Sequence, residues 1–125
     1  YSPLGRGFFG GALPEDPSTL PANDYRRNDP RFQGENYTRN RALLAAIEKV
    51  ALQHEAKPAQ VALAWLLARG PDIVPIPGTK RRSYLEVNAE AVHLMLTPAE
   101  ITELDALGAA SGPRYSERAM AMIER

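Results

Sequence analysis

The most informative segment of the chain runs from Ile73 to Asn88 and reads I-V-P-I-P-G-T-K-R-R-S-Y-L-E-V-N. Its first four residues form a short apolar run whose length and β-branching predict a buried strand. Pro77-Gly78 predicts a turn, and a helical pattern over about 82–90 follows. Because a helical pattern also precedes the strand, the unit is typical of a parallel α/β sheet.

The turn between this predicted strand and helix carries the residues of an anion site. Thr79 supplies a hydroxyl, and Lys80, Arg81 and Arg82 supply positive charge. Gly78 lets the backbone approach a ligand closely, and the unpaired N–H groups of a helix N-terminus attract anions. Arg can grip phosphate through two hydrogen bonds, whereas Lys acts as a point charge. The pattern predicts a phosphate-bearing ligand; the alternative is a solvated basic turn.

The rest of the chain divides into a loop and a set of helices. Residues 1 to about 40 are rich in Gly, Pro, Asn and Asp, which predicts a long loop with a strand stub at its start. Apolar spacing and capping signals predict the helices. These helices are expected at about 38–54, 58–69, 97–108 and 116–124. The second of them is apolar nearly all round, so we expect it to be deeply packed.

Length and composition exclude several classes of protein. The chain has 125 residues and a formal net charge of zero, so no overall field favours nucleic acid or a membrane surface. It has no cysteine, no long apolar run and no pair of His or Cys residues with metal-ligand spacing. One strand is too few for an α/β core, and the chain opens on a motif without an initiator Met. We therefore expect a cytoplasmic protein and a chain that is part of a longer one.

Two motifs resemble cofactor loops of the aldo-keto reductases. The stretch 73–88 resembles the last βα loop of that family, and Y-S-P-L-G-R-G at 1–7 resembles the loop after its seventh barrel strand. The stretches 29–36 and 59–67 are similar to the microbial and plant branch of the family. The resemblance spans nearly the whole chain.

This resemblance implies that residues 1–125 are the C-terminal half of one (β/α)₈ TIM barrel domain, an α/β fold that is mostly helical in this part. Such barrels typically need about 250 residues. Residues 1–40 would be the loop after strand 7, bordering the active site, and residues 41–125 would hold strand 8 and the last helices.

The resemblance also implies NADP(H) as the cofactor. Tyr1 matches the aromatic residue that stacks under the nicotinamide, Ser2 to Arg6 match the loop that fastens the pyrophosphate, and Asn88 matches the residue that hydrogen-bonds the adenine. The implied cofactor-binding residues are Tyr1, Ser2, Leu4, Gly5, Arg6, Gly78, Thr79, Lys80, Arg81 and Asn88.

One residue departs from the family's adenine motif. The family has Leu-Glu-Glu-Asn where this chain has Leu85-Glu86-Val87-Asn88. Val87 cannot accept a hydrogen bond from the adenine amino group, so we expect NADPH binding to be weaker by about 1 kcal/mol. For Asn88 the alternative is a polar helix residue that faces solvent.

The family reduces aldehydes and ketones to alcohols with a Tyr proton donor assisted by Lys, Asp and His. In the family all four lie in the N-terminal half, so we assign no catalytic residue on this chain. Because the alkoxide must be protonated, we expect the chain alone to be inactive. The expected partners are the N-terminal half of the barrel and a small carbonyl substrate, with no nucleic acid, membrane or metal. The alternatives are an NADPH-binding regulatory scaffold, similar to potassium-channel β subunits, and an inactive truncated fragment.

Overall fold

A computed structural model describes residues 1–10 and 13–123, and all regular secondary structure in these residues is helical. The α-helices are α1 (Gly34–Gln53), α2 (Pro58–Leu67), α3 (Arg82–Ala89), α4 (Pro98–Ala106) and α5 (Glu117–Ile123). The 3₁₀ helices are η1 (Gly5–Gly10), η2 (Pro17–Thr19), η3 (Tyr25–Asn28), η4 (Pro30–Phe32) and η5 (Glu90–His93). The predicted helices are thus confirmed within the described residues, with ends that coincide or shift by up to four residues. The predicted end of the last helix, Glu124, lies outside the described residues.

Contacts divide the chain into two units. The first consists of Tyr1–Leu13 and Leu44–Gly108, and the second of Pro14–Leu43 and Ala109–Arg125. All ten residues predicted to bind the cofactor belong to the first unit.

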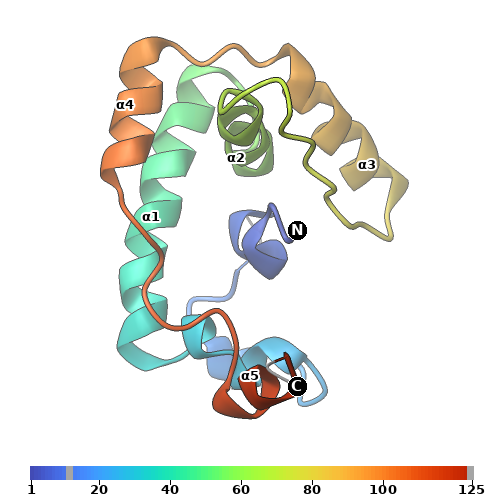
Figure 1. The fold of residues 1–125 in the computed structure, drawn as a ribbon, viewed down its shortest axis with the longest axis vertical. Helices are drawn as coiled ribbons and strands as arrows, with labels where there is room; N and C mark the ends of the chain where they lie inside the picture. The colour runs from blue at the N-terminus through green and yellow to red at the C-terminus, as the bar shows by residue number, and fades with distance from the viewer. Residues whose placement is uncertain (11–12, 124–125) are drawn as a thin grey trace. The chain divides into compact units, whose positions relative to one another are not determined.

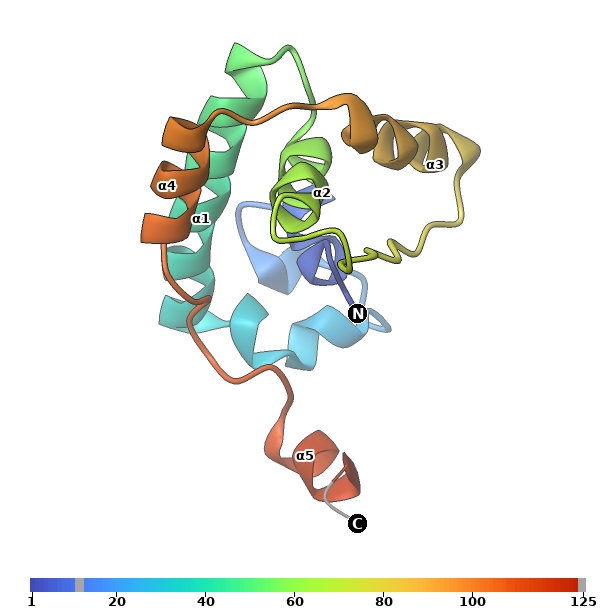
Figure 2. The ribbon, with the colours of Figure 1, turned by 45° about the horizontal axis from the view of Figure 1, so that its top comes forward.

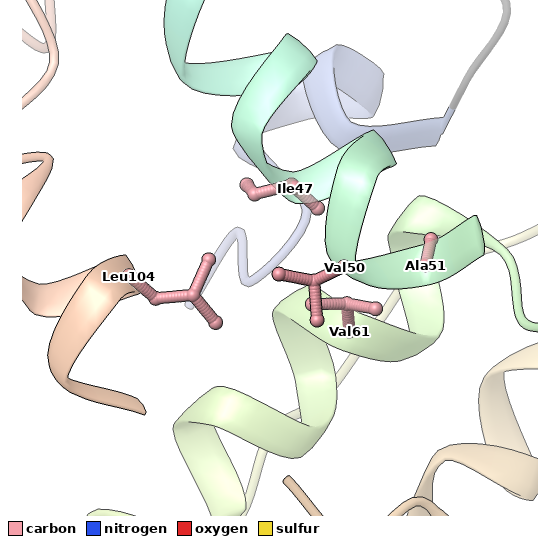
Figure 3. Close-up of a cluster of buried hydrophobic side chains, with 5 residues drawn as sticks. All are labelled: Ile47, Val50, Ala51, Val61 and Leu104. Carbon is pink, nitrogen blue, oxygen red and sulfur yellow. The ribbon is translucent and has the colours of Figure 1, made fainter. Parts of the chain in front are cut away.

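The core of the first unit lies where α1, α2 and α4 meet. Ile47, Val50 and Ala51 of α1 pack against Val61 of α2 and Leu104 of α4. Figure 3 shows these five side chains on the three helices, with Leu104 facing Val50 and Val61. Val50 and Val61 are completely buried. The prediction that α2 would be deeply packed is confirmed, since Ala59 and residues 61–64 are also buried.

Polar contacts fasten α4 to the helices beside it (Figures 1 and 2). Lys49 of α1 forms an ion pair of 2.8 Å with Glu103. On the other side, Asp105 accepts hydrogen bonds from the Trp65 indole at 2.7 Å and from Arg69 at 3.0 Å. Both hydrogen bonds stabilise the ionised carboxylate, so the pKa of Asp105 lies below its ordinary value, chiefly because of Arg69.

The predicted capping box at the start of α4 is confirmed. The Thr97 hydroxyl accepts a hydrogen bond from the Glu100 N–H, and the Glu100 carboxylate accepts one from the Thr97 N–H at 2.7 Å. His54, just beyond the end of α1, contacts the other carboxylate oxygen of Glu100 at 2.8 Å. The bond from the Thr97 N–H is the largest cause that lowers the pKa of Glu100.

The prediction of a buried strand at 73–76 is wrong for this structure. Residues 73–79 are extended but belong to no sheet, and Val74 and Ile76 are 78% and 69% exposed. Figure 2 shows the segment running unpaired from the end of α2 to α3. A strand satisfies its backbone groups only through neighbouring strands, and the described residues contain none. The α/β barrel therefore stays a prediction.

The prediction of one long loop over residues 1–40 is also wrong in part. The strand stub at its start is absent, four short 3₁₀ helices lie within the described part of the loop, and α1 begins at Gly34. Aspartates cap three of these turns, because Asp16, Asp24 and Asp29 each accept a hydrogen bond from the backbone N–H two residues on. Short polar side chains that bond their own backbone in this way favour turns.

The second unit is held together by hydrogen bonds from α1 side chains. Asn40 is buried and donates to the carbonyls of Arg31 and Ser111, at 3.0 Å each. It also accepts a hydrogen bond of 2.7 Å from the Ser111 N–H. Arg31 in turn donates to the Gly112 carbonyl. The chain after Gly108 is thereby fixed to the turns that precede α1.

Candidate functional site

The cationic turn of residues 78–82 joins the extended segment to α3. Gly78, Thr79, Lys80 and Arg81 are all exposed. The Thr79 hydroxyl accepts a hydrogen bond of 3.2 Å from the Arg81 N–H and donates to the Arg81 carbonyl at 3.3 Å. These two bonds close the turn on itself and fix the backbone from which the basic side chains project.

The first turn of α3 has no cap. Arg81 occupies the N-cap position without a side-chain hydrogen bond. The N–H groups of Arg82 and Ser83 form no hydrogen bond with any other described residue. Unbonded N–H groups at a helix start carry a partial positive charge. The uncapped start of α3 therefore suits an anion.

The basic side chains of the turn differ in their partners. Arg82 is paired with Glu86 at 2.8 Å, although both side chains are largely exposed. The Arg81 guanidinium lies over the Tyr84 ring, 5.5 Å from its centroid. Lys80 forms no ion pair or hydrogen bond within the described part of the chain. Lys80 is thus the cation of this turn that is most available to a ligand.

Asn88 lies one helical turn beyond Tyr84. The residue as a whole is only 8% exposed. Its side chain forms no hydrogen bond with another described residue. Because no side-chain N or O atom of the described residues is both buried and without a partner, this unbonded amide reaches solvent and is available to a ligand. Val87 beside it is half-buried and offers no polar group.

The N-terminal motif forms a tight succession of turns. The N–H of Gly5 donates to the Ser2 carbonyl, and the N–H groups of Gly7 and Phe9 donate to the Leu4 carbonyl. Gly5, Arg6 and Gly7 all have positive φ, at 56°, 60° and 85°.

Ser2 has a φ of 52° as well. Left-handed backbone at residues with a side chain is uncommon and is concentrated at ligand clamps. Tyr1 and Ser2 are exposed, whereas Leu4 and Arg6 are half-buried.

Helix α2 contacts both of the segments that carry the predicted cofactor motifs. Both η1 and α3 contact it (Figure 1). Phe9 of η1 packs against the core cluster, and Phe8 beside it is buried. The burial of the apolar α2 therefore positions both motifs, about seventy residues apart in sequence.

One contact at the turn was not predicted from the sequence, namely the stack of Arg81 on Tyr84. The signal was present, because residues three apart on a helix face one another. Metal chemistry has no candidate here, since no group of three His, Cys, Asp or Glu residues in the described ranges could hold an ion. In the same residues, no helix combines the length and apolar character needed to cross a membrane.

Comparison with known proteins gives a consistent family. The profile of the Aldo/keto reductase family matches residues 1–109. Aldo-keto reductase yakc [NADP(+)] of Schizosaccharomyces pombe is 49% identical over 104 residues, which is 83% of this chain and 30% of that protein. Probable aldo-keto reductase 1 of Glycine max is 44% identical over 118 residues, covering 92% of this chain and 34% of that protein.

A third relative, aldo-keto reductase str7 of Strobilurus tenacellus, is 43% identical over 101 residues, or 81% of this chain and 30% of that protein. The chain thus spans about a third of the length of the curated relatives it matches, a smaller share than the half that the sequence led us to expect.

Proposed function

The chain belongs to the aldo/keto reductase family, and we propose that it is the nucleotide-binding C-terminal part of an NADPH-dependent reductase of aldehydes and ketones. The rest of the protein would supply the missing strands of a (β/α)₈ barrel, the catalytic residues and most of the carbonyl site. In such barrels, phosphate sites are frequently built from the loops after strands 7 and 8.

One observation carries the proposal: an unpaired cation stands beside an uncapped helix start. Lys80 has no partner in the described residues, and the N–H groups of Arg82 and Ser83 are unbonded. The first N–H groups of any helix lack intrahelical partners, and a phosphate can use both these groups and the cation beside them. A relative that carries NADP(+) in its name supports the choice of dinucleotide.

The residues present fit the phosphate and base ends of NADP(H). The cationic turn would hold the 2′-phosphate, and the available amide of Asn88 would meet the base. The N-terminal turns, Tyr1 with Ser2 to Arg6, would hold the pyrophosphate and nicotinamide side. When bound, the nicotinamide supplies hydride; the residues of this chain bind and orient the dinucleotide, and a proton donor must come from outside it.

The test is binding of NADPH to this polypeptide, followed by NADPH fluorescence, with NADH as the comparison. We expect NADPH to bind more tightly than NADH, because only NADPH carries the 2′-phosphate. Lys80→Ala should weaken NADPH binding roughly 10-fold or more, the worth of a charged hydrogen bond, and leave NADH binding nearly unchanged.

The matched control is Arg39→Ala. Arg39 is an exposed cation on α1, paired with Glu35 four residues away, and its removal changes net charge by the same amount. Equal losses of NADPH affinity in Lys80→Ala and Arg39→Ala would show that overall charge causes the effect, and would refute the phosphate site. Equal affinity of the wild-type chain for NADPH and NADH would refute it as well.

A further inference from the structure

Ser83 is the second residue of α3 and directly follows the three cations of the cationic turn. It is exposed, and its hydroxyl forms no hydrogen bond with another described residue. The proposed phosphate contacts use the Ser83 N–H and leave the hydroxyl without a role. This hydroxyl can therefore be modified without the loss of any contact within the described chain.

The sequence before Ser83 distinguishes it from the other hydroxyl residues. Lys80, Arg81 and Arg82 occupy the three positions before it, and no other serine or threonine of the chain has a basic residue at more than one of these positions. Protein kinases select their substrates by such charge patterns. A run of cations directly before a serine suits a kinase whose peptide-binding cleft is acidic, because the two potentials are complementary.

The chain around Ser83 is open to such a cleft. Residues 78–86 are all exposed, although α3 begins at Arg82. The start of this helix has no side-chain cap, and the ion pair of Arg82 with Glu86 lies at the surface, where such pairs contribute little. Few contacts therefore oppose the opening of the first turn of α3 when a kinase binds it.

We propose that Ser83 is a phosphorylation site for a basophilic serine kinase, and that the phosphoserine excludes NADPH from the cationic turn. In the transfer, the Ser83 Oγ attacks the γ-phosphorus of a nucleoside triphosphate. The bond from that phosphorus to the bridging oxygen breaks, and the nucleoside diphosphate leaves. The hydroxyl proton passes to a base of the kinase.

The exclusion of NADPH rests on the proposed function. A phosphoserine carries a charge of about −1.5 to −2, and at Ser83 it would follow Arg82 directly and Lys80 by three residues. Its oxygens would accept hydrogen bonds from these cations and from the unbonded N–H groups at the start of α3. The 2′-phosphate of NADPH would need the same donors. Competition for them and repulsion between the two phosphates both weaken NADPH binding.

The first measurement is phosphoryl transfer to the intact chain. The probe is the catalytic subunit of cyclic-AMP-dependent protein kinase with ATP, and mass spectrometry gives the number and positions of the phosphoryl groups. We expect one group, on Ser83, and none in Ser83→Ala, whose helix content circular dichroism checks. Lys80→Ala and Arg81→Ala should slow the transfer roughly 10-fold or more, whereas Arg39→Ala, which removes an exposed cation of α1, should not.

The second measurement is NADPH binding before and after phosphorylation, followed by NADPH fluorescence. The phosphorylated chain should bind NADPH about 10-fold or more weakly, the worth of a charged hydrogen bond, and NADH nearly as before. Treatment with a phosphatase should restore the affinity. Ser83→Ala taken through the same kinase treatment should keep the NADPH affinity that it has without treatment.

The contrary results separate the two proposals. No transfer to wild type, or transfer that Ser83→Ala receives to the same extent, would overturn the phosphorylation site. If the phosphorylated chain binds NADPH as tightly as the unmodified one, the exclusion of NADPH is refuted and the proposed function stands. If the unmodified chain does not bind NADPH, the proposed function fails and the exclusion fails with it, whereas the mass measurement still decides the site at Ser83.

Discussion

Helix α2 and the extended segment 73–76 are both strongly apolar, yet one is the centre of the first unit and the other lies in solvent. Residues 61–64 of α2 are buried, whereas Val74 and Ile76 are largely exposed. Composition does not explain this difference. A helix satisfies its own backbone hydrogen bonds, so α2 forms wherever its apolar surface meets α1 and α4.

The extended segment cannot satisfy its own backbone hydrogen bonds as a helix does. In the described chain, its one backbone hydrogen bond joins the Ile73 N–H to the Gly70 carbonyl. Its apolar side chains match a strand buried on both faces, whereas here Val74 and Ile76 are largely exposed and Pro75 is only half-buried. The contrast indicates that the helices and the cationic turn assemble locally, whereas a strand at 73–76 would require neighbouring strands.

The largest expected effect tests the helical side of this contrast. Leu104→Ala should lower the free energy of unfolding by about 2–5 kcal/mol, because it leaves a cavity between α1, α2 and α4. Urea unfolding followed by circular dichroism measures the change. Leu52→Ala, at a position that is 79% exposed on α1, is the control and should change little. Similar losses in the two variants would mean that the three-helix core is not the source of stability.

Next in size is the buried amide of the second unit. Asn40→Ala removes the bonds to the Arg31 carbonyl and to both backbone groups of Ser111. We expect a loss of about 1–3 kcal/mol, the penalty for buried groups left without partners. Hydrogen exchange at the Ser111 amide should accelerate. Unchanged exchange in Asn40→Ala would contradict the role assigned to this side chain.

A smaller effect is expected at the start of α4. Thr97→Ala should cost about 1 kcal/mol, since it removes the cap of the helix N-terminus. Thr97→Ser keeps a capping hydroxyl and should retain most of the stability. Chemical denaturation of the two variants side by side is the measurement, and equal losses would show that the cap contributes nothing.

The same capping box predicts a pH dependence. The pKa of Glu100 lies below its ordinary value of 4.5 in the folded chain. Stability from this group is therefore complete above pH 4.5 and is lost as pH falls through the lowered folded value. The loss should be smaller than that in Thr97→Ala, because the Thr97 hydroxyl still caps the helix. In Glu100→Gln the acid slope of stability should flatten, and a slope identical to wild type would contradict the prediction.

The smallest effect tests the extended segment. Val74→Lys should change the unfolding free energy of this chain by no more than about 0.5 kcal/mol, as is usual for exposed positions. A loss of several kcal/mol on urea unfolding would show that the segment is already packed. With the strands of a complete barrel present, the same substitution would bury a charge and should be severely destabilising.

Local signals in the sequence were enough to predict most of the helical structure. The helix positions, the capping box at Thr97 and the burial of α2 follow from patterns within a few residues, and they are confirmed. The strand at 73–76 could not be judged in the same way, because a strand forms only beside neighbouring strands, and the described residues contain none. Two features were not predicted. The burial of Asn88 depends on packing against other elements, which the local sequence does not reveal. The capping of η2 to η4 by aspartates could have been predicted from the Asp-Pro and Asp-Tyr pairs.

For the candidate site, sequence could identify the residue types but not their partners. The sequence does not distinguish the three cations of residues 80–82, yet in the structure Arg82 pairs with Glu86 and Arg81 lies over the Tyr84 ring. Only the folded α3 separates Lys80 from its neighbours, since it brings residues three and four apart together.

The most direct test of the phosphate site is a titration of the ¹⁵N-labelled chain with adenosine 2′,5′-bisphosphate, followed through its amide resonances. We predict that the largest shifts occur at Thr79, Arg82 and Ser83, where a bound phosphate would meet the turn and the bare N–H groups of α3. Saturable shifts confined to other parts of the chain, with these three amides unmoved, would contradict it.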